Sequence, residues 1–220
     1  MVDNASAGTF EGRLRHALVL INLLGNASVP LFRGAALEKV GLYLTRTEQG
    51  GAQGCEDWDL SLRVAEISTV RMVPEFLVTY QRNGSSMSVN AKSMAASYAV
   101  VMNRARQRNG DLPSITVRWS AGYFYLYLAD QCNVCCRYSE CLRFLKHAIR
   151  ANPVLLLKAG IYKWLIKAAV KIAPGSTAKI NGTTDFQSNK RKKRSCALNL
   201  PFRYFEVARW SAALHDGAYR

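Results

Sequence analysis

The chain has 220 residues, 49% of them hydrophobic, so it is long enough for one sizeable domain with a packed core. Thirty Lys and Arg against fifteen Asp and Glu give a net charge of +15, which indicates an anionic partner such as a nucleotide, a nucleic acid or an acidic membrane surface. Most of the acids lie in residues 1–90, so the charge pattern disfavours a uniform nucleic-acid groove. No run approaches the roughly 20 apolar residues needed to span a bilayer.

The six cysteines include four that fall between positions 132 and 141. This spacing is too crowded for a disulfide framework in a chain of this length, so we expect reduced thiols in a cytosolic setting. Cys132, Cys135 and Cys136 could suggest a zinc site, but no second pair at ligand spacing follows them. Packed helix residues are therefore the favoured interpretation of this cluster.

The first half of the chain predicts a mixture of helices and strands. Residues 14–24 are apolar and predict a helix. Pro30 then favours a loop that enters a short strand at residues 29–33. Residues 34–40 predict a second short helix, for which Gly41 is a plausible terminating residue.

A glycine-rich loop at residues 45–54 leads into a predicted helix at residues 56–66. The acids in the first turn of that helix suit the positive end of the helix dipole. Residues 70–80 predict a strand or a pair of strands, and residues 82–90 predict a loop of small residues.

The second half is helical in its pattern. Helical spacing begins at Ala91, breaks at residues 109–113, and continues in two predicted helices at residues 118–136 and 139–151. These two helices resemble a single helical hairpin, which is one unit and not a repeat array.

Residues 154–173 predict a basic amphipathic helix. One face carries four lysines, namely Lys158, Lys163, Lys167 and Lys171. Such a helix either lies in an anionic membrane surface or packs on the protein with its lysines in water, and both interpretations stay open. The basic run at 190–194 is typical of a nuclear localisation signal, a nucleic-acid-binding patch or a solvated tail. It could also strengthen the attraction to an anionic membrane.

Three carboxylates and a tryptophan crowd into four residues at Glu56, Asp57, Trp58 and Asp59. Neighbouring carboxylates raise one another's proton affinity, so one of them can serve as a general base. Trp58 offers a flat apolar face that suits a sugar ring or a base. The other interpretation is a helix start with favourably placed charge, and the chemistry leaves both open.

Three segments in this order resemble the family-2 glycosyltransferases. The first is residues 25–43, where a strand and a short helix precede a glycine-containing turn. The second, residues 54–63, matches a Glu-Asp-x-Asp-Leu-x-x-Arg helix. The third, residues 80–88, resembles a Tyr-Arg-x-x-x-x-Ser-Met-Ser loop, and the order and spacing match over residues 20–85.

The resemblance implies a GT-A fold and the transfer of a sugar, with inversion, from a nucleotide-sugar donor to a glycan or cell-surface acceptor. It implies that Asp57 is the catalytic base and that Glu56 supports it. It implies acceptor-binding roles for Trp58, Asn26 and Ser28.

The resemblance also implies that Arg82 approaches the donor diphosphate, and that Asp59 and Arg63 order the helix. Family members use a divalent metal, Mn or Mg, held by an Asp-x-Asp site in a preceding region. That metal site is absent here, because the Asp57-Trp58-Asp59 triplet belongs to the later motif. Leu44 also stands where the family usually has an aspartate.

We therefore expect an α/β fold in which residues 1–90 form the C-terminal half of an incomplete GT-A (Rossmann-like) domain. A mainly α-helical extension at 91–153, the amphipathic helix at 154–174 and a basic, largely disordered tail at 175–220 would follow. Because the donor-binding half is missing, we expect weak transfer or none from this chain alone.

The expected location is the cytoplasm, peripheral to the inner face of the plasma membrane through residues 154–174. The alternative is a small basic protein without catalysis that binds anionic membrane or nucleic acid, with nucleic acid the less favoured partner.

Overall fold

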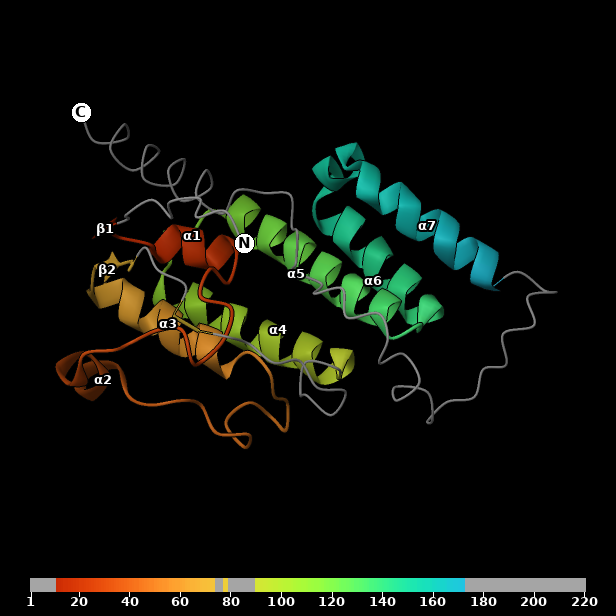
Figure 1. The fold of residues 1–220 in the computed structure, drawn as a ribbon. Helices are drawn as coiled ribbons and strands as arrows, with labels where there is room; N and C mark the ends of the chain where they lie inside the picture. Colours follow the sequence, from red (N-terminus) through yellow and green to blue (C-terminus); the bar gives the residue numbers. More distant parts are fainter. Residues whose placement is uncertain (1–10, 74–76, 79–89, 173–220) are drawn as a thin grey trace, which may run out of the picture.

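Helices dominate the computed structural model, which describes residues 11–73, 77–78 and 90–172 (Figure 1). The helices are α1 (Arg15–Leu20), α2 (Gly34–Val40), α3 (Glu56–Ile67), α4 (Ala91–Arg108), α5 (Ser114–Val134), α6 (Tyr138–Ala151), the short 3-10 helix η2 (Pro153–Leu157) and α7 (Ala159–Ile172). Two strands of two residues each, β1 (Glu11–Gly12) and β2 (Val70–Arg71), pair antiparallel with Glu11 opposite Arg71.

The predicted α/β fold is wrong. A GT-A half would need strands at residues 29–33 and 70–80, but the first of these segments is a loop in which Leu31 is 100% exposed. Of the second segment, only Val70–Arg71 is a strand within the described residues. A segment forms a stable strand only when neighbouring strands and a packed face support it, and here helices occupy the core instead.

Several predicted helices are confirmed. The one expected at residues 56–66 is α3, and those expected at 34–40 and 139–151 are α2 and α6. Gly41 ends α2 as expected, because its φ of +81° suits glycine and its N–H donates to the Leu37 carbonyl at 2.7 Å. The helix expected at 154–173 is divided, since residues 153–157 form the 3-10 helix η2 and α7 begins only at Ala159.

The core is centred on α5, which contacts α1, α4 and α6. This helix is apolar on most sides, the pattern of a helix enclosed by its neighbours. By contrast, α6 is amphipathic and buries one stripe, made of Cys141, Phe144, Leu145 and Ala148. The packing of α6 on α5 confirms the predicted helical hairpin.

Gly122 allows the C-terminal end of α6 to approach α5 closely. A Cβ atom added at this position would stand 2.4 Å from the Cβ of Asn152 and 3.3 Å from the Ala148 carbonyl oxygen. Neither is the far end of a flexible side chain, so the backbone itself would have to shift.

A Gly122→Ala substitution should therefore reduce the free energy of unfolding by about 1–3 kcal/mol, the usual cost of overpacking a core. Urea denaturation followed by circular dichroism measures this change. Gly160→Ala is the matched control, because no atom lies within 4 Å of its added Cβ and alanine favours a helix by about 0.5–1 kcal/mol. Equal effects of the two substitutions would contradict the assignment of Gly122 as the contact point.

Candidate functional site

The acidic start of α3 is held by α4 through the loop before it. The Gln53 N–H donates to Ser93 Oγ at 3.0 Å, and the Cys55 N–H donates to Ser97 Oγ at 3.1 Å. Gly54, between them, has a φ of +123°, and an added Cβ would stand 2.8 Å from Met94 Cγ. The loop preceding α3 is therefore hydrogen-bonded to one face of α4, which fixes the positions of Glu56 and Asp57.

Ser93 and Ser97 hold the loop before α3, and the sequence pattern did not identify them. They lie four residues apart, so they occupy the same face of α4. Two small hydroxyl side chains at this spacing are a weak signal that this face bonds to another backbone. Their partners lie about 40 residues away in the chain, and no local pattern identifies them.

Asp57 is a half-buried carboxyl group in the first turn of α3. Its Oδ1 accepts a hydrogen bond from the Trp58 N–H at 2.7 Å. Burial raises the pKa of Asp57 to about 6; the Trp58 N–H opposes this shift, and the neighbouring Glu56 adds to it. The group is therefore largely ionised at neutral pH, yet it binds a proton much more readily than an ordinary aspartate.

Glu56 bonds backward to the loop. Its Oε2 accepts from the Gly54 N–H at 2.7 Å, so the side chain closes the turn that precedes the helix. The structure thus brings Glu56 and Asp57 together at the same helix end, with Glu56 supporting the local geometry.

Trp58 lies in the core, where it is 3% exposed. Its ring packs against Tyr98 and Phe124, with centroid separations of 5.5 and 6.0 Å. Its Nε1–H donates to the Leu18 carbonyl at 2.7 Å, which satisfies an oxygen near the end of α1. The indole ring presents no open face on which a sugar could stack, so the acceptor role expected for it has no geometric support.

Asp59 and Arg63 order the helix, as expected. Asp59 is 0% exposed and receives the Arg63 Nε–H at 2.7 Å. Arg63 also donates to the carbonyls of Val40 and Leu42, so it ties the end of α2 to α3. A second cation, Arg108 on α4, approaches Asp59 at 3.6 Å.

Of the other predicted site residues, the structure describes Asn26 and Ser28. Asn26 Oδ1 accepts from the Ser28 N–H at 2.8 Å, which forms a local turn in the loop between α1 and α2. Among the described residues, no hydrogen bond or ion pair joins Asn26 or Ser28 to Glu56 or Asp57. Arg82 falls outside the described residues.

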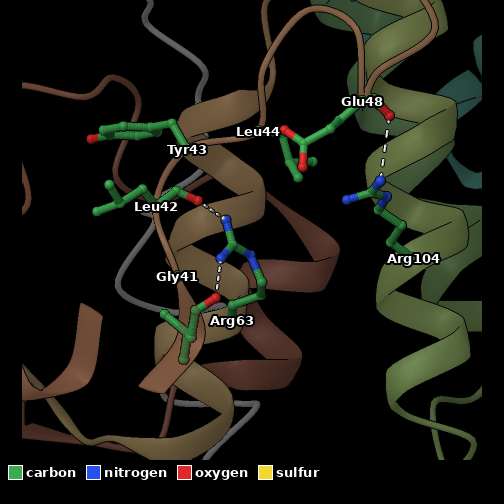
Figure 2. Close-up of a pocket in the computed structure, with 8 residues that line it drawn as sticks. Gly41, Leu42, Tyr43, Leu44, Glu48, Arg63 and Arg104 are labelled. Carbon is green, nitrogen blue, oxygen red and sulfur yellow. Dashed lines mark hydrogen bonds between the residues drawn. The ribbon is translucent and has the colours of Figure 1, made fainter. Parts of the chain in front are cut away.

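A surface hollow of about 510 Å³ lies beside α3 (Figure 2). Arg63 and Arg104 bring positive charge to its wall, and Arg104 donates to the Glu48 carbonyl at 3.3 Å. Neither Glu56 nor Asp57 lines it, so the hollow and the acidic helix start are separate features. Its lining consists of Val40, Gly41, Leu42, Tyr43, Leu44, Glu48, Arg63 and Arg104.

The described residues do not fit the divalent metal that the family resemblance implies. No group of three or more His, Cys, Asp or Glu among them could hold a metal ion. The two aspartates of the Asp57-Trp58-Asp59 triplet also do not converge, since Asp59 is committed to Arg63 and Arg108. No chemical step is therefore assigned to a metal here.

Comparison of the chain with protein-family models, curated proteins and solved structures finds no match. The functional interpretation thus depends on the residues at the start of α3.

Proposed function

We propose that the start of α3 is the acceptor side of an inverting glycosyl-transfer site, in which Asp57 is the general base. The observation that carries this proposal is the half-buried Asp57 carboxyl with a pKa of about 6, on a helix start that α4 holds in place. A general base works best when its pKa lies near the working pH. An ordinary solvated aspartate is too weak a base for this task.

In the proposed reaction, the acceptor hydroxyl oxygen attacks the anomeric carbon of a nucleotide sugar. The bond from that carbon to the diphosphate oxygen breaks, and the diphosphate leaves with the electron pair. The hydroxyl proton passes to Asp57. Because Oδ1 accepts from Trp58, Oδ2 is the oxygen that would receive the proton.

The roles of the neighbouring residues follow from their contacts. Glu56 holds the turn before the helix, while Asp59 and Arg63 fix α3 against α2. Neither Asp59 nor Trp58 has an open side for a substrate. The groups that would hold the donor diphosphate are not assigned among the described residues, and we expect transfer by this chain alone to be weak.

The test is a transfer assay over a panel of UDP- and GDP-sugars and oligosaccharide acceptors, with and without Mn²⁺ or Mg²⁺, followed by mass spectrometry. The rate should rise with pH up to about pH 6 and then level off, because the base must be ionised. Below that point the rate should fall about tenfold per pH unit. A rate that is flat from pH 5 to pH 8 would contradict a base role for Asp57.

Acceptor binding gives a second readout that does not need turnover. A bound hydroxyl at Asp57 should move the side-chain ¹³C resonance of that carboxyl in NMR titrations with the same acceptors. The proposal fails if no acceptor moves this resonance and no transfer is detected.

A further inference from the structure

One face of α7 leaves a line of apolar side chains uncovered by the helices described. The helix packs on α6 and buries Ile161 and Ala168. Tyr162, Ile166 and Val170, each four residues from the next, are 49%, 65% and 61% exposed. Side chains at this spacing form one stripe along a helix. Figure 1 shows α7 lying along α6 on the far side of the molecule from α2 and α3.

The uncovered apolar surface continues into η2. Leu157 is 86% exposed and Val154 is 54% exposed. The Tyr162 hydroxyl donates to the Leu156 carbonyl at 2.8 Å, which joins this short helix to the first turn of α7. We call the residues Val154, Leu157, Tyr162, Ile166 and Val170 the outer face.

A row of lysines borders the outer face. Lys163, Lys167 and Lys171 each follow a position of the apolar stripe by one residue, which is about 100° around the helix. Lys167 donates to Asn133 Oδ1 at 3.0 Å, so this row runs along the side of α7 that faces the end of α5. Lys163 and Lys171 are exposed.

The charge carried by α6, η2 and α7 is mostly positive. Between residues 138 and 172 the sequence has seven Lys and Arg and one acid, Glu140. That acid is already paired with Arg137 at 3.7 Å and Arg143 at 3.9 Å. An apolar stripe bordered by unbalanced lysines complements a surface that is negatively charged on the outside and apolar beneath.

We propose that the outer face of α7 and η2 docks on the surface of an anionic lipid bilayer, with the helix lying in the membrane plane. Apolar side chains enter the boundary between headgroups and acyl chains, and the lysines contact anionic headgroups. Among the described residues, no helix is long and apolar enough to cross a membrane. This surface lies on elements other than α3, so the membrane-docking proposal does not depend on the proposed glycosyl transfer.

The test measures cosedimentation of the full chain with vesicles of 70% phosphatidylcholine and 30% phosphatidylglycerol, against vesicles of phosphatidylcholine alone. Binding should require the anionic lipid and should weaken as NaCl rises. Lys163→Gln with Lys171→Gln should reduce the partition coefficient about 30-fold, at about fivefold for each lysine near an anionic surface. Ile166→Ser with Val170→Ser should reduce it at least about tenfold, because two apolar contacts are lost.

The matched control removes two exposed cations from α6, Lys146→Gln with Arg150→Gln. It changes the net charge by the same amount but leaves the outer face intact, so its effect should stay below about threefold. Circular dichroism checks that each variant keeps its helix content. An equal loss in the control and in the Lys163 and Lys171 variant would mean that binding follows net charge alone, and would overturn the proposal.

Two other occupants of the outer face are outcomes of the same experiment. If a second copy of the chain covers it, the Ile166 and Val170 variant should change the mass seen by light scattering and leave vesicle binding unchanged. If another part of the chain covers it, the protein should bind neither kind of vesicle. Either result would overturn docking on a bilayer.

Discussion

An Asp57→Asn variant should lose sugar transfer by about 10²–10⁴-fold, the usual contribution of a general base, and should also be more stable than the parent protein at pH 7. The loss of transfer and the gain of stability both follow from the buried carboxylate of Asp57. Burial makes the ionised carboxylate of Asp57 costly and raises its pKa from an ordinary value of 3.8 to about 6. Asparagine is neutral and keeps an oxygen that can accept from the Trp58 N–H.

The sign of the stability change follows from proton binding. Between pH 4 and pH 6 the folded protein holds a proton on Asp57 more tightly than the unfolded chain does, so unfolding releases protons. Stability contributed by this group is therefore present at low pH and is lost as the pH rises through about 6. A shift of about two pKa units corresponds to up to about 3 kcal/mol, which the partial exposure of the group and the helix dipole reduce.

We accordingly expect Asp57→Asn to gain about 1–2 kcal/mol at pH 7 and almost nothing at pH 4, measured by urea denaturation at both values. Asp111→Asn is the control of opposite sign, because a hydrogen bond from Arg15 lowers the pKa of that exposed carboxyl. That control should lose a little stability at pH 7.

The stability result separates the two interpretations of the acidic helix start. If Asp57 served chiefly as a helix cap with favourable charge, its replacement would destabilise the protein at pH 7. A stability gain without a loss of transfer would support the destabilising burial of the Asp57 carboxylate but would reject its role as the catalytic base. Active-site residues often lower the stability of the folded enzyme, and in this chain Asp57 is the residue expected to do so.

The helices could be predicted because their apolar spacing is local. The stripe of Cys141, Phe144, Leu145 and Ala148 defines α6 without reference to the rest of the chain. The strand at residues 29–33 was predicted wrongly because a strand depends on partners that a short segment does not contain. This segment contains apolar residues that suit a strand, but no strand in the described part of the chain pairs with it, and Leu31 projects into solvent.

The candidate site was predictable in part for the same reason. The spacing of Asp59 and Arg63 by four residues is a local signal for an ion pair on one helix face, and the structure confirms it. Trp58 has its own local signal, since it shares helical spacing with the buried Leu62 and Ala65, and this marks it as a core residue. The bonds from Ser93 and Ser97 are long-range, so only the folded structure shows them.

Arg63→Met should cost about 3–5 kcal/mol of unfolding free energy, the range expected when one partner of a buried ion pair is removed. Asp59 is 0% exposed, and without Arg63 its carboxylate would keep Arg108 at 3.6 Å as its remaining ion-pair contact. The carbonyls of Val40 and Leu42 would lose their donor as well. Methionine fills much of the arginine stem, so the loss should reflect charge and hydrogen bonding more than packing.

The double variant Asp59→Leu with Arg63→Met tests whether the unpaired charge is the cause. Removing both ions takes away the buried charge, so the double variant should be less destabilised than Arg63→Met alone. Arg108 keeps Glu66, whose two carboxylate oxygens each accept from its Nε at 3.1 Å. Urea denaturation at pH 7 with a constant m-value measures both variants. A loss below about 1 kcal/mol for Arg63→Met would place this pair with the weak surface ion pairs and remove its role in holding α2 against α3.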